Sequence, residues 1–195
     1  MRIYRTAVAL VLGGSITAVT LFARENPGRG VVPQKSTVKS VQEDGVAVFF
    51  SPNGGCEEAV VNVLDHAQKT IDMQAYSFTN RAIGSALVEA QKRGVKLRVI
   101  LDFDASGQNP RQPEYIAKND VPTWTDHEHS IAHNKIIVVD NATVITGSFN
   151  FTEQAENYNA ENLVVLTDKP KIAAAYEANF ESHLKHSKVY KAEQK

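Results

Sequence analysis

The segment His133-Asn-Lys-Ile-Ile-Val-Val-Asp140 begins with polar, titratable side chains and continues as a run of β-branched residues. The run predicts a strand, Lys135–Asp140, that is buried in a sheet. A second strand-like run, Thr143–Ser148, follows after Asn141-Ala142, and two runs joined by so short a connection predict a hairpin. The fold prediction and the site prediction both start from this hairpin.

Polar side chains gather at one end of the predicted hairpin. Side chains alternate along a strand, so His133 and Lys135 are expected on one side of the first strand. Ser148 and Asn150 share a side in the same way. An ammonium, a hydroxyl and an amide are donors suited to phosphoryl oxygens, so the patch predicts a phosphate site. Asp140 has the opposite parity and is expected to secure the turn as a structural residue.

Strand-like and helix-like segments alternate before the hairpin, and strands cluster before a last helix. We expect further strands at residues 46–50, 71–78, 96–103, 123–125 and 161–167, and helices at residues 57–68, 80–94, 114–118 and 171–186. This order predicts an α/β fold of one domain, in which helices flank both faces of a mixed β-sheet.

Residues 1–23 have the composition of an export segment. A short basic start precedes an uncharged stretch, residues 6–23, which is typical either of a signal peptide or of an N-terminal membrane anchor. Residues 24–45 are polar and are predicted to be a linker, which leaves residues 46–195 for the catalytic domain. We therefore expect an exported protein that is periplasmic or secreted, or is held at the membrane by residues 6–23.

The charge balance restricts the way in which this chain can bind anions. Its 21 Lys and Arg residues stand against 22 Asp and Glu residues, a formal net charge of −1. This balance excludes a polycation that coats nucleic acid or membrane by bulk charge. Anion binding must therefore come from a local site.

The remaining histidines raise an alternative to that phosphate site. His127, His129 and His133 form an H-x-H-x3-H pattern, and imidazole is the commonest metal ligand. We interpret His127 and His129 as part of a solvated loop. We interpret His183 and His186 as the solvated end of the closing helix, where positive charge suits the helix dipole. No metal and no cofactor is predicted.

The two hairpin elements resemble the signature of the phospholipase D superfamily. H-x-K-x4-D stands at residues 133–140, and the following G-S-x-N element stands at residues 147–150. The resemblance covers residues 46–186. Within the superfamily the chain most resembles the small bacterial endonucleases, through Tyr76-Ser-Phe-Thr79 and Gly147-Ser-Phe-Asn-Phe-Thr152.

This resemblance implies a phosphodiesterase that needs no metal. By likeness to the family, His133 attacks phosphorus and forms a covalent phosphohistidine, which water then hydrolyses. Lys135, Ser148 and Asn150 hold the phosphate and stabilise the charge that develops on it. Glu161 matches the acid that orients the nucleophilic histidine in these nucleases.

The same chemistry needs a second histidine, which protonates the leaving oxygen and then activates water. A second copy of the motif would supply it, but His183-Leu-Lys185 is followed by Tyr190 in place of Asp. His186-Ser-Lys188 is followed by Glu193, and no room remains for a G-S-x-N element. We therefore predict a homodimer whose composite site takes one histidine from each chain across a two-fold axis.

Three functions follow from these patterns. The leading prediction is a non-specific endonuclease that acts on DNA, with RNA as a further substrate. The first alternative is hydrolysis of a lipid phosphodiester, of the phospholipase D or cardiolipin type, because the same phosphoryl machinery accepts either diester. The second alternative is a metal-binding or nucleic-acid-binding module built on the histidines at residues 127–133.

Overall fold

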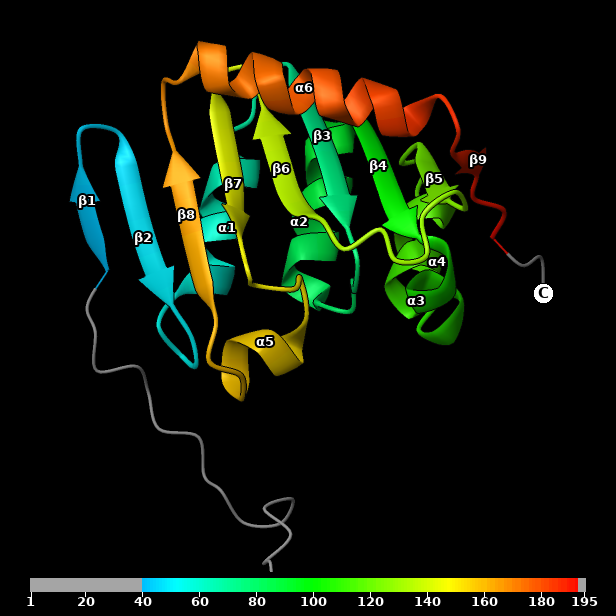
Figure 1. Ribbon diagram of the computed structural model, residues 1–195, viewed down its shortest axis with the longest axis horizontal. Helices are drawn as coiled ribbons and strands as arrows, with labels where there is room; N and C mark the ends of the chain where they lie inside the picture. The colour runs from blue at the N-terminus through cyan, green and yellow to red at the C-terminus, as the bar shows by residue number, and fades with distance from the viewer. Residues whose placement is uncertain (1–39, 193–195) are drawn as a thin grey trace, which may run out of the picture. The chain divides into compact units, whose positions relative to one another are not determined.

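This computed structural model describes residues 40–192. They fold around a mixed sheet of nine strands (Figure 1). The strands are β1 (Val41–Glu43), β2 (Val46–Phe50), β3 (Thr70–Ala75), β4 (Lys96–Asp102), β5 (Thr123–Asp126), β6 (Lys135–Val139), β7 (Thr143–Gly147), β8 (Asn162–Leu166) and β9 (Lys188–Val189). Their order across the sheet is β1-β2-β8-β7-β6-β3-β4-β5-β9. The pairs β3–β4 and β4–β5 are parallel, and the other neighbouring pairs are antiparallel.

Helices cover both faces of this sheet. They are α1 (Cys56–Asp65), α2 (Arg81–Lys92), α3 (Phe103–Gln108), α4 (Arg111–Lys118), α5 (Glu153–Asn157) and α6 (Pro170–Leu184). Helix α6 lies across one face, over β7, β6, β3 and β5, and α1 and α2 lie on the other (Figure 1). The α/β prediction, with helices on both faces of a mixed sheet, is confirmed.

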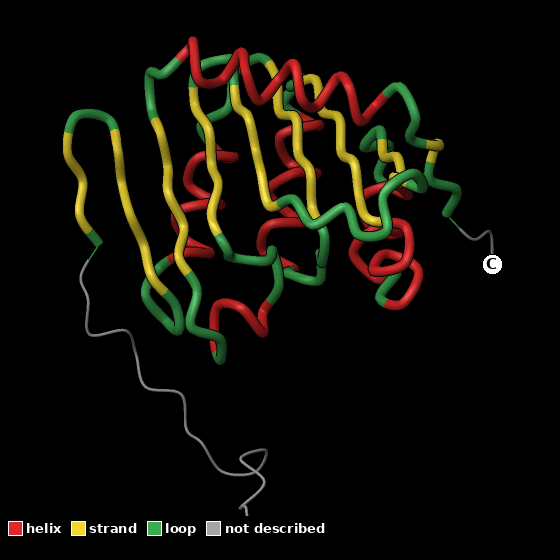
Figure 2. The backbone as a smooth tube through the Cα atoms, in the orientation of Figure 1, coloured by secondary structure: helices red, strands yellow, loops and turns green. Residues whose placement is uncertain are grey.

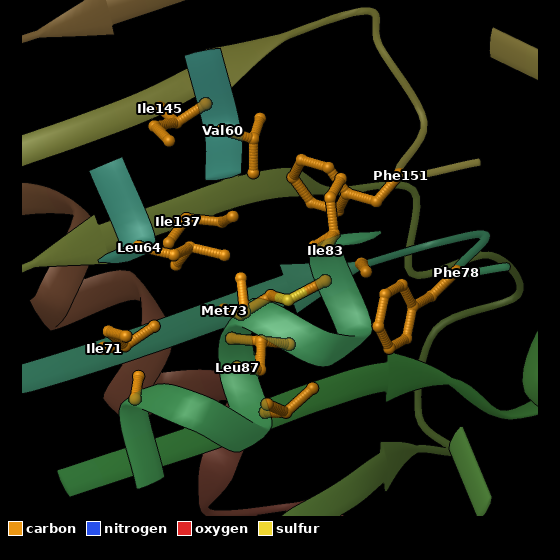
Figure 3. Close-up of a cluster of buried hydrophobic side chains, with 14 of the residues drawn as sticks. Val60, Leu64, Ile71, Met73, Phe78, Ile83, Leu87, Ile137, Ile145 and Phe151 are labelled. Atoms are coloured by element: carbon orange, nitrogen blue, oxygen red, sulfur yellow. The ribbon is translucent and has the colours of Figure 1, made fainter. Parts of the chain in front are cut away.

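Side chains along β6 and β7 alternate between the two faces of the sheet, and each face has its own hydrophobic core. Ile137 and Ile145 are fully buried on the side of α1 and α2, in one cluster with Val60, Leu64 and Leu87 (Figure 3). The neighbouring side chains point the other way and pack against α6; these are Ile136, Val138 and Val144, with Ala173 of the helix. The hairpin is thus buried on both faces, as its continuous apolar run predicts.

The predicted hairpin is present, but its bounds differ slightly. Strands β6 and β7 pair antiparallel, with Val139 opposite Thr143. Asp140 and Asn141 in the turn have positive φ angles of 53° and 56°, which these residue types tolerate. His133 lies in the loop before β6, so its place is decided by that loop as well as by the strand.

A second hairpin replaces the end of the predicted linker. Strand β1 lies inside residues 24–45 and pairs with β2, with Glu43 opposite Val46. The two residues between them, Asp44 and Gly45, both have positive φ. Asp-Gly is a strong hairpin signal, so this strand could have been found from the sequence. The folded sheet therefore begins before Val46.

The N-terminal prediction concerns residues that the structure does not describe. The signal peptide or anchor at residues 1–23, and the linker up to residue 39, lie outside the described residues. Within residues 40–192, no helix combines the length and the apolar character that a membrane span requires.

The strand directions bring several chain segments to one edge of the sheet. The carboxyl ends of β3, β4, β5 and β7 lie at this edge, together with the starts of β6 and β8. The loop at residues 127–134 runs along the same edge from β5 to β6, because β3 and β4 lie between those two strands (Figure 2). Residues far apart in the sequence therefore meet there.

Asp140 secures the opposite edge. Its carboxylate accepts hydrogen bonds from the backbone N–H groups of Gln68, Lys69 and Thr70, at 2.9, 2.6 and 2.9 Å. Burial opposes ionisation, but the three donors hold the pKa of Asp140 below its ordinary value. The motif aspartate therefore fastens the end of β6 to the start of β3 and lies at the far end of β6 from His133.

We expect Asp140→Ala to lower the free energy of unfolding by about 2–3 kcal/mol, because three donors lose their acceptor and alanine disfavours a positive φ. Asp140→Asn keeps one oxygen acceptor and tolerates the turn, so about 1 kcal/mol is expected. Urea denaturation of each variant measures both values.

The pH dependence of these differences in unfolding free energy tests whether the ionised carboxylate of Asp140 stabilises the fold. Its folded pKa lies below the unfolded value, so its stabilisation is complete above about pH 4 and is lost as pH falls through the folded pKa. The stability gap between the wild type and Asp140→Asn should therefore shrink below pH 4. A gap that stays constant between pH 6 and pH 3 would contradict this role.

Candidate active site

The topology places the predicted catalytic side chains at the same edge of the sheet. Lys135 starts β6 opposite Ala75, the last residue of β3, and Tyr76 follows it. Ser148 follows β7, and Glu161 precedes β8. The antiparallel hairpin and its neighbours thus bring these groups to one edge of the sheet.

His133 and Lys135 form the centre of the site. The His133 side chain is exposed to solvent, whereas Lys135 is only 7% exposed and donates from Nζ to the His133 carbonyl oxygen at 2.9 Å. Tyr76 touches both residues: its ring centroid is 4.7 Å from the His133 ring and 5.1 Å from Lys135 Nζ. An accessible imidazole therefore lies next to a sheltered cation.

Burial lowers the pKa of Lys135, and the negative charge of Glu161 acts in the opposite direction. The ammonium has lost much of its hydration, and charges interact more strongly where water is excluded. A phosphate that enters the site can recover the lost solvation energy, so Lys135 is suited to bind an anion.

Ser148 and Glu161 lie beside this pair. Ser148 Oγ donates to Glu161 Oε2 at 2.6 Å and accepts from the Asn162 backbone N–H at 3.1 Å. Glu161 Oε1 accepts from Asn159 Nδ2 at 3.0 Å. Within the described residues the Glu161 carboxylate is hydrogen-bonded to these two side chains, so its orientation of His133 stays a prediction.

Asn150 lies in the loop between β7 and α5. Its neighbours Phe149 and Phe151 are fully buried, and the Phe151 carbonyl oxygen accepts from the backbone N–H groups of Thr79 and Asn80 at 3.0 Å each. Asn150 Oδ1 is buried and has no hydrogen-bond partner among the described residues. A buried polar atom without a partner lowers stability, and its retention here fits a role in binding.

A surface groove of about 450 Å³ opens beside His133 and Lys135. The β7 residues Thr146 and Gly147 line one part of it, and α6 contributes Tyr176 and Asn179. Neither α6 residue could be assigned from the sequence, because both follow the motif by about 40 positions and carry no local signal. Only the packing of α6 on the sheet reveals them.

Asp102 positions the loop that carries His133. This residue is 4% exposed at the end of β4. Its Oδ2 accepts from the Ala132 backbone N–H at 2.8 Å, and its Oδ1 accepts from the Ala105 backbone N–H at the start of α3. One carboxylate thus joins a helix cap to the residue before His133. A strand-end aspartate followed by a helix is the only sequence signal for it.

The H-x-H-x3-H pattern does not form one site. His127 hydrogen-bonds Thr125 and packs on Phe103, whereas His133 lies in the loop just before β6. His129 instead meets Asp126, together with His183 and His186.

The interpretation of His183 and His186 as a solvated helix end is wrong. Their side chains are 13% and 28% exposed, and both hydrogen-bond Asp126. The cause is the pairing of β9 with β5, which folds the chain after α6 back onto the end of β5.

Comparisons with known proteins agree with this geometry. A family model described as "Cardiolipin synthase, PLD-like domain" matches residues 60–184. A protein named "Phospholipase D" from Rickettsia felis is 38% identical over 135 residues, which are 69% of this chain and 67% of the relative. A mitochondrial cardiolipin hydrolase from Xenopus tropicalis is 33% identical over 61% of this chain and 56% of the relative.

A protein of known structure is similar to this chain in both sequence and fold. The crystal structure of Nuc from Salmonella typhimurium, described as a phospholipase D family member, superposes with a TM-score of 0.73. It is 39% identical in sequence and is matched over 75% of this chain and 97% of its own. NucT from Helicobacter pylori, at 20% identity and a TM-score of 0.66, shares the fold.

Gly147 is required by the close approach of β7 and β8 at the site. Its φ of 148° is unfavourable for other residues, and a Cβ there would collide with the Asn162 backbone and lie 3.1 Å from Leu163 Cα. We expect Gly147→Ala to lower the free energy of unfolding by about 2–4 kcal/mol and to displace Ser148. Urea denaturation measures the first effect.

Gly107→Ala provides a matched control. Gly107 lies in α3, where an added Cβ meets open space. The free energy of unfolding of the Gly107→Ala variant should therefore equal that of the wild type or exceed it by up to about 1 kcal/mol. If the two variants are equally stable, the tight β7–β8 contact does not restrict residue 147.

Proposed function

The chain belongs to the phospholipase D superfamily and is a phosphodiester hydrolase, and from this premise we propose that it is an exported, homodimeric endonuclease that cleaves DNA without a metal ion. The observation that carries the proposal is the exposed imidazole of His133 beside the sheltered ammonium of Lys135. RNA is a further substrate in this proposal, because contacts to phosphate do not read base sequence.

The proposed reaction takes place in two displacements at phosphorus. A ring nitrogen of His133 forms a bond to phosphorus, the bond from phosphorus to the leaving oxygen breaks, and a second histidine gives that oxygen a proton. Water then attacks phosphorus and yields a proton to the second histidine as the bond to His133 breaks. Lys135, Ser148 and Asn150 stabilise the non-bridging oxygens throughout.

The exposed position of His133 supports a composite site. Each chain carries one H-x-K-x4-D motif. The second histidine of the proposed reaction must therefore come from another chain and reach the same phosphate. Ile131, two residues before His133, is 57% exposed, so a second copy that covers this edge would also bury an apolar side chain. We propose that a second copy places its own His133 opposite the first.

The polar groups of the groove beside His133 are the basis for proposing nucleic acid as the first substrate. Asn134, Lys135 and Asn179 provide polar groups that suit a phosphate backbone, and Tyr176 adds an aromatic ring, the kind of side chain on which a base stacks. Ile136 and Ala175 also line the groove, so its apolar part is available to either substrate class. Hydrolysis of a lipid phosphodiester remains the second candidate, because relatives bear the names phospholipase D and mitochondrial cardiolipin hydrolase.

His133→Asn tests the chemistry. In excess EDTA, the wild type should cleave plasmid DNA and leave phosphatidylcholine and cardiolipin vesicles intact. The variant should lose activity by about three orders of magnitude or more, because the nucleophile is gone. Its melting temperature should match the wild type, since the side chain is exposed.

His66→Asn serves as a control, because His66 is an exposed histidine that follows α1. It should retain full activity. Cleavage of the vesicles but not of DNA would overturn the substrate proposal. Activity that disappears in EDTA, or that survives in His133→Asn, would overturn the mechanism.

Mixing the two kinds of chain tests the composite site. Wild type and His133→Asn are unfolded together in equal amounts and refolded, so that chains pair at random. If both histidines are needed, only dimers of two wild-type chains are active, and activity falls to about one quarter of an all-wild-type sample. Activity of about one half would show that each chain acts alone.

A further inference from the structure

Asp126 and three histidines converge at the end of β5, away from the groove beside His133. The Asp126 side chain is fully buried. Its Oδ1 accepts from the backbone N–H groups of Glu128 and His129, at 3.0 and 3.3 Å. This leaves Oδ2 directed toward the imidazoles of His129, His183 and His186.

The three imidazoles surround one carboxylate oxygen. His129 Nδ1 and His183 Nδ1 each lie 2.9 Å from Asp126 Oδ2, and His186 Nε2 lies 3.2 Å from it. The four candidate ligand atoms all lie within 4.8 Å of one another. The ring centroids are 4.8 to 5.4 Å apart, so each imidazole can turn one nitrogen toward a common centre.

This arrangement is close to the shape of a tetrahedral metal site. Zinc binds histidine nitrogen and carboxylate oxygen at about 2.0–2.2 Å, which places neighbouring ligand atoms about 3.4 Å apart. The three distances from Asp126 Oδ2 to nitrogen, 2.9 to 3.2 Å, need to lengthen only slightly. The His129 side chain is 47% exposed and gives an ion a route in from solvent.

We propose that Asp126, His129, His183 and His186 bind one divalent transition-metal ion, with Zn²⁺ as the favoured species. Imidazole with carboxylate is a ligand set that zinc accepts readily. Four protein ligands leave no open coordination position for water, which is typical of a structural site rather than a catalytic one.

The ion would tie together segments that are distant in the sequence. His183 lies in the last turn of α6, His186 follows that helix, and His129 lies in the loop that leads to His133. Strands β3 and β4 separate the cluster from β6, a lateral spacing of about 14 Å at the usual distance between strands. The ion would therefore bind outside the phosphate site, and the proposal stands independently of the phosphodiester chemistry.

Zinc content and thermal stability test this site. Full-length protein without a histidine tag is stripped with EDTA, desalted and dialysed against Zn²⁺, and bound zinc is measured by mass spectrometry. We expect about one zinc per chain. At a hundredfold excess over Kd, the melting temperature should exceed that in EDTA by roughly 5–10 °C.

A pair of neighbouring histidines supplies the matched variants. His129→Gln removes a ligand and should weaken zinc binding at least tenfold, whereas His127→Gln, from the same loop, should bind zinc as the wild type does. His183→Gln should behave like His129→Gln. Circular dichroism in EDTA checks that each variant is folded. If His183→Gln fails to fold because His183 is largely buried, the variant of the more exposed His129 still tests the zinc site.

The proposal is overturned if zinc binds well below one equivalent, if Zn²⁺ leaves the melting temperature unchanged, or if His127→Gln weakens binding as much as His129→Gln. None of these readouts uses DNA or lipid. Failure of the zinc proposal is therefore distinguishable from failure of the proposed nuclease activity.

Discussion

The central position of β6 is the constraint on which the rest of the structure depends. The strand pairs with β3 on one side and β7 on the other, and its apolar side chains enter both cores. At one end Asp140 fastens it to the backbone of residues 68–70. At the other end the Tyr76 backbone N–H donates to the Asn134 carbonyl oxygen at 2.9 Å. These contacts fix both ends of β6, and they therefore also fix the positions of His133 and Lys135.

One edge of the sheet carries two distinct groups of polar side chains. The proposed phosphate site lies where β6, β7 and β8 meet, and the Asp126 cluster lies at β5. The loop at residues 127–134 joins them, and Asp102 holds its last part through Ala132. The position of His133 is thus supported from β4 and β5 as well as from its own strand, and a proposed catalytic group benefits from such preorganisation.

Much of this architecture could be predicted because its signals are local. Strand alternation, the turn at Asp140 and Asn141, and the close spacing of the two motif elements all act over a few residues. Local signals were also misread: Asp44-Gly45 marks the β1–β2 hairpin inside a segment interpreted as linker. The helix-dipole argument for His183 and His186 failed for another reason, since their partner Asp126 is about 60 residues earlier in the chain.

The sequence by itself determined the α/β class, the β6–β7 hairpin and the choice of candidate residues for the phosphate site, because periodicity and motif spacing are properties of neighbouring residues. Only the tertiary structure decided that Tyr76 lies against His133, that α6 forms a wall of the groove, and that three histidines meet Asp126. Those contacts depend on the order and direction of strands across the sheet, which long-range burial selects and no short stretch of sequence encodes.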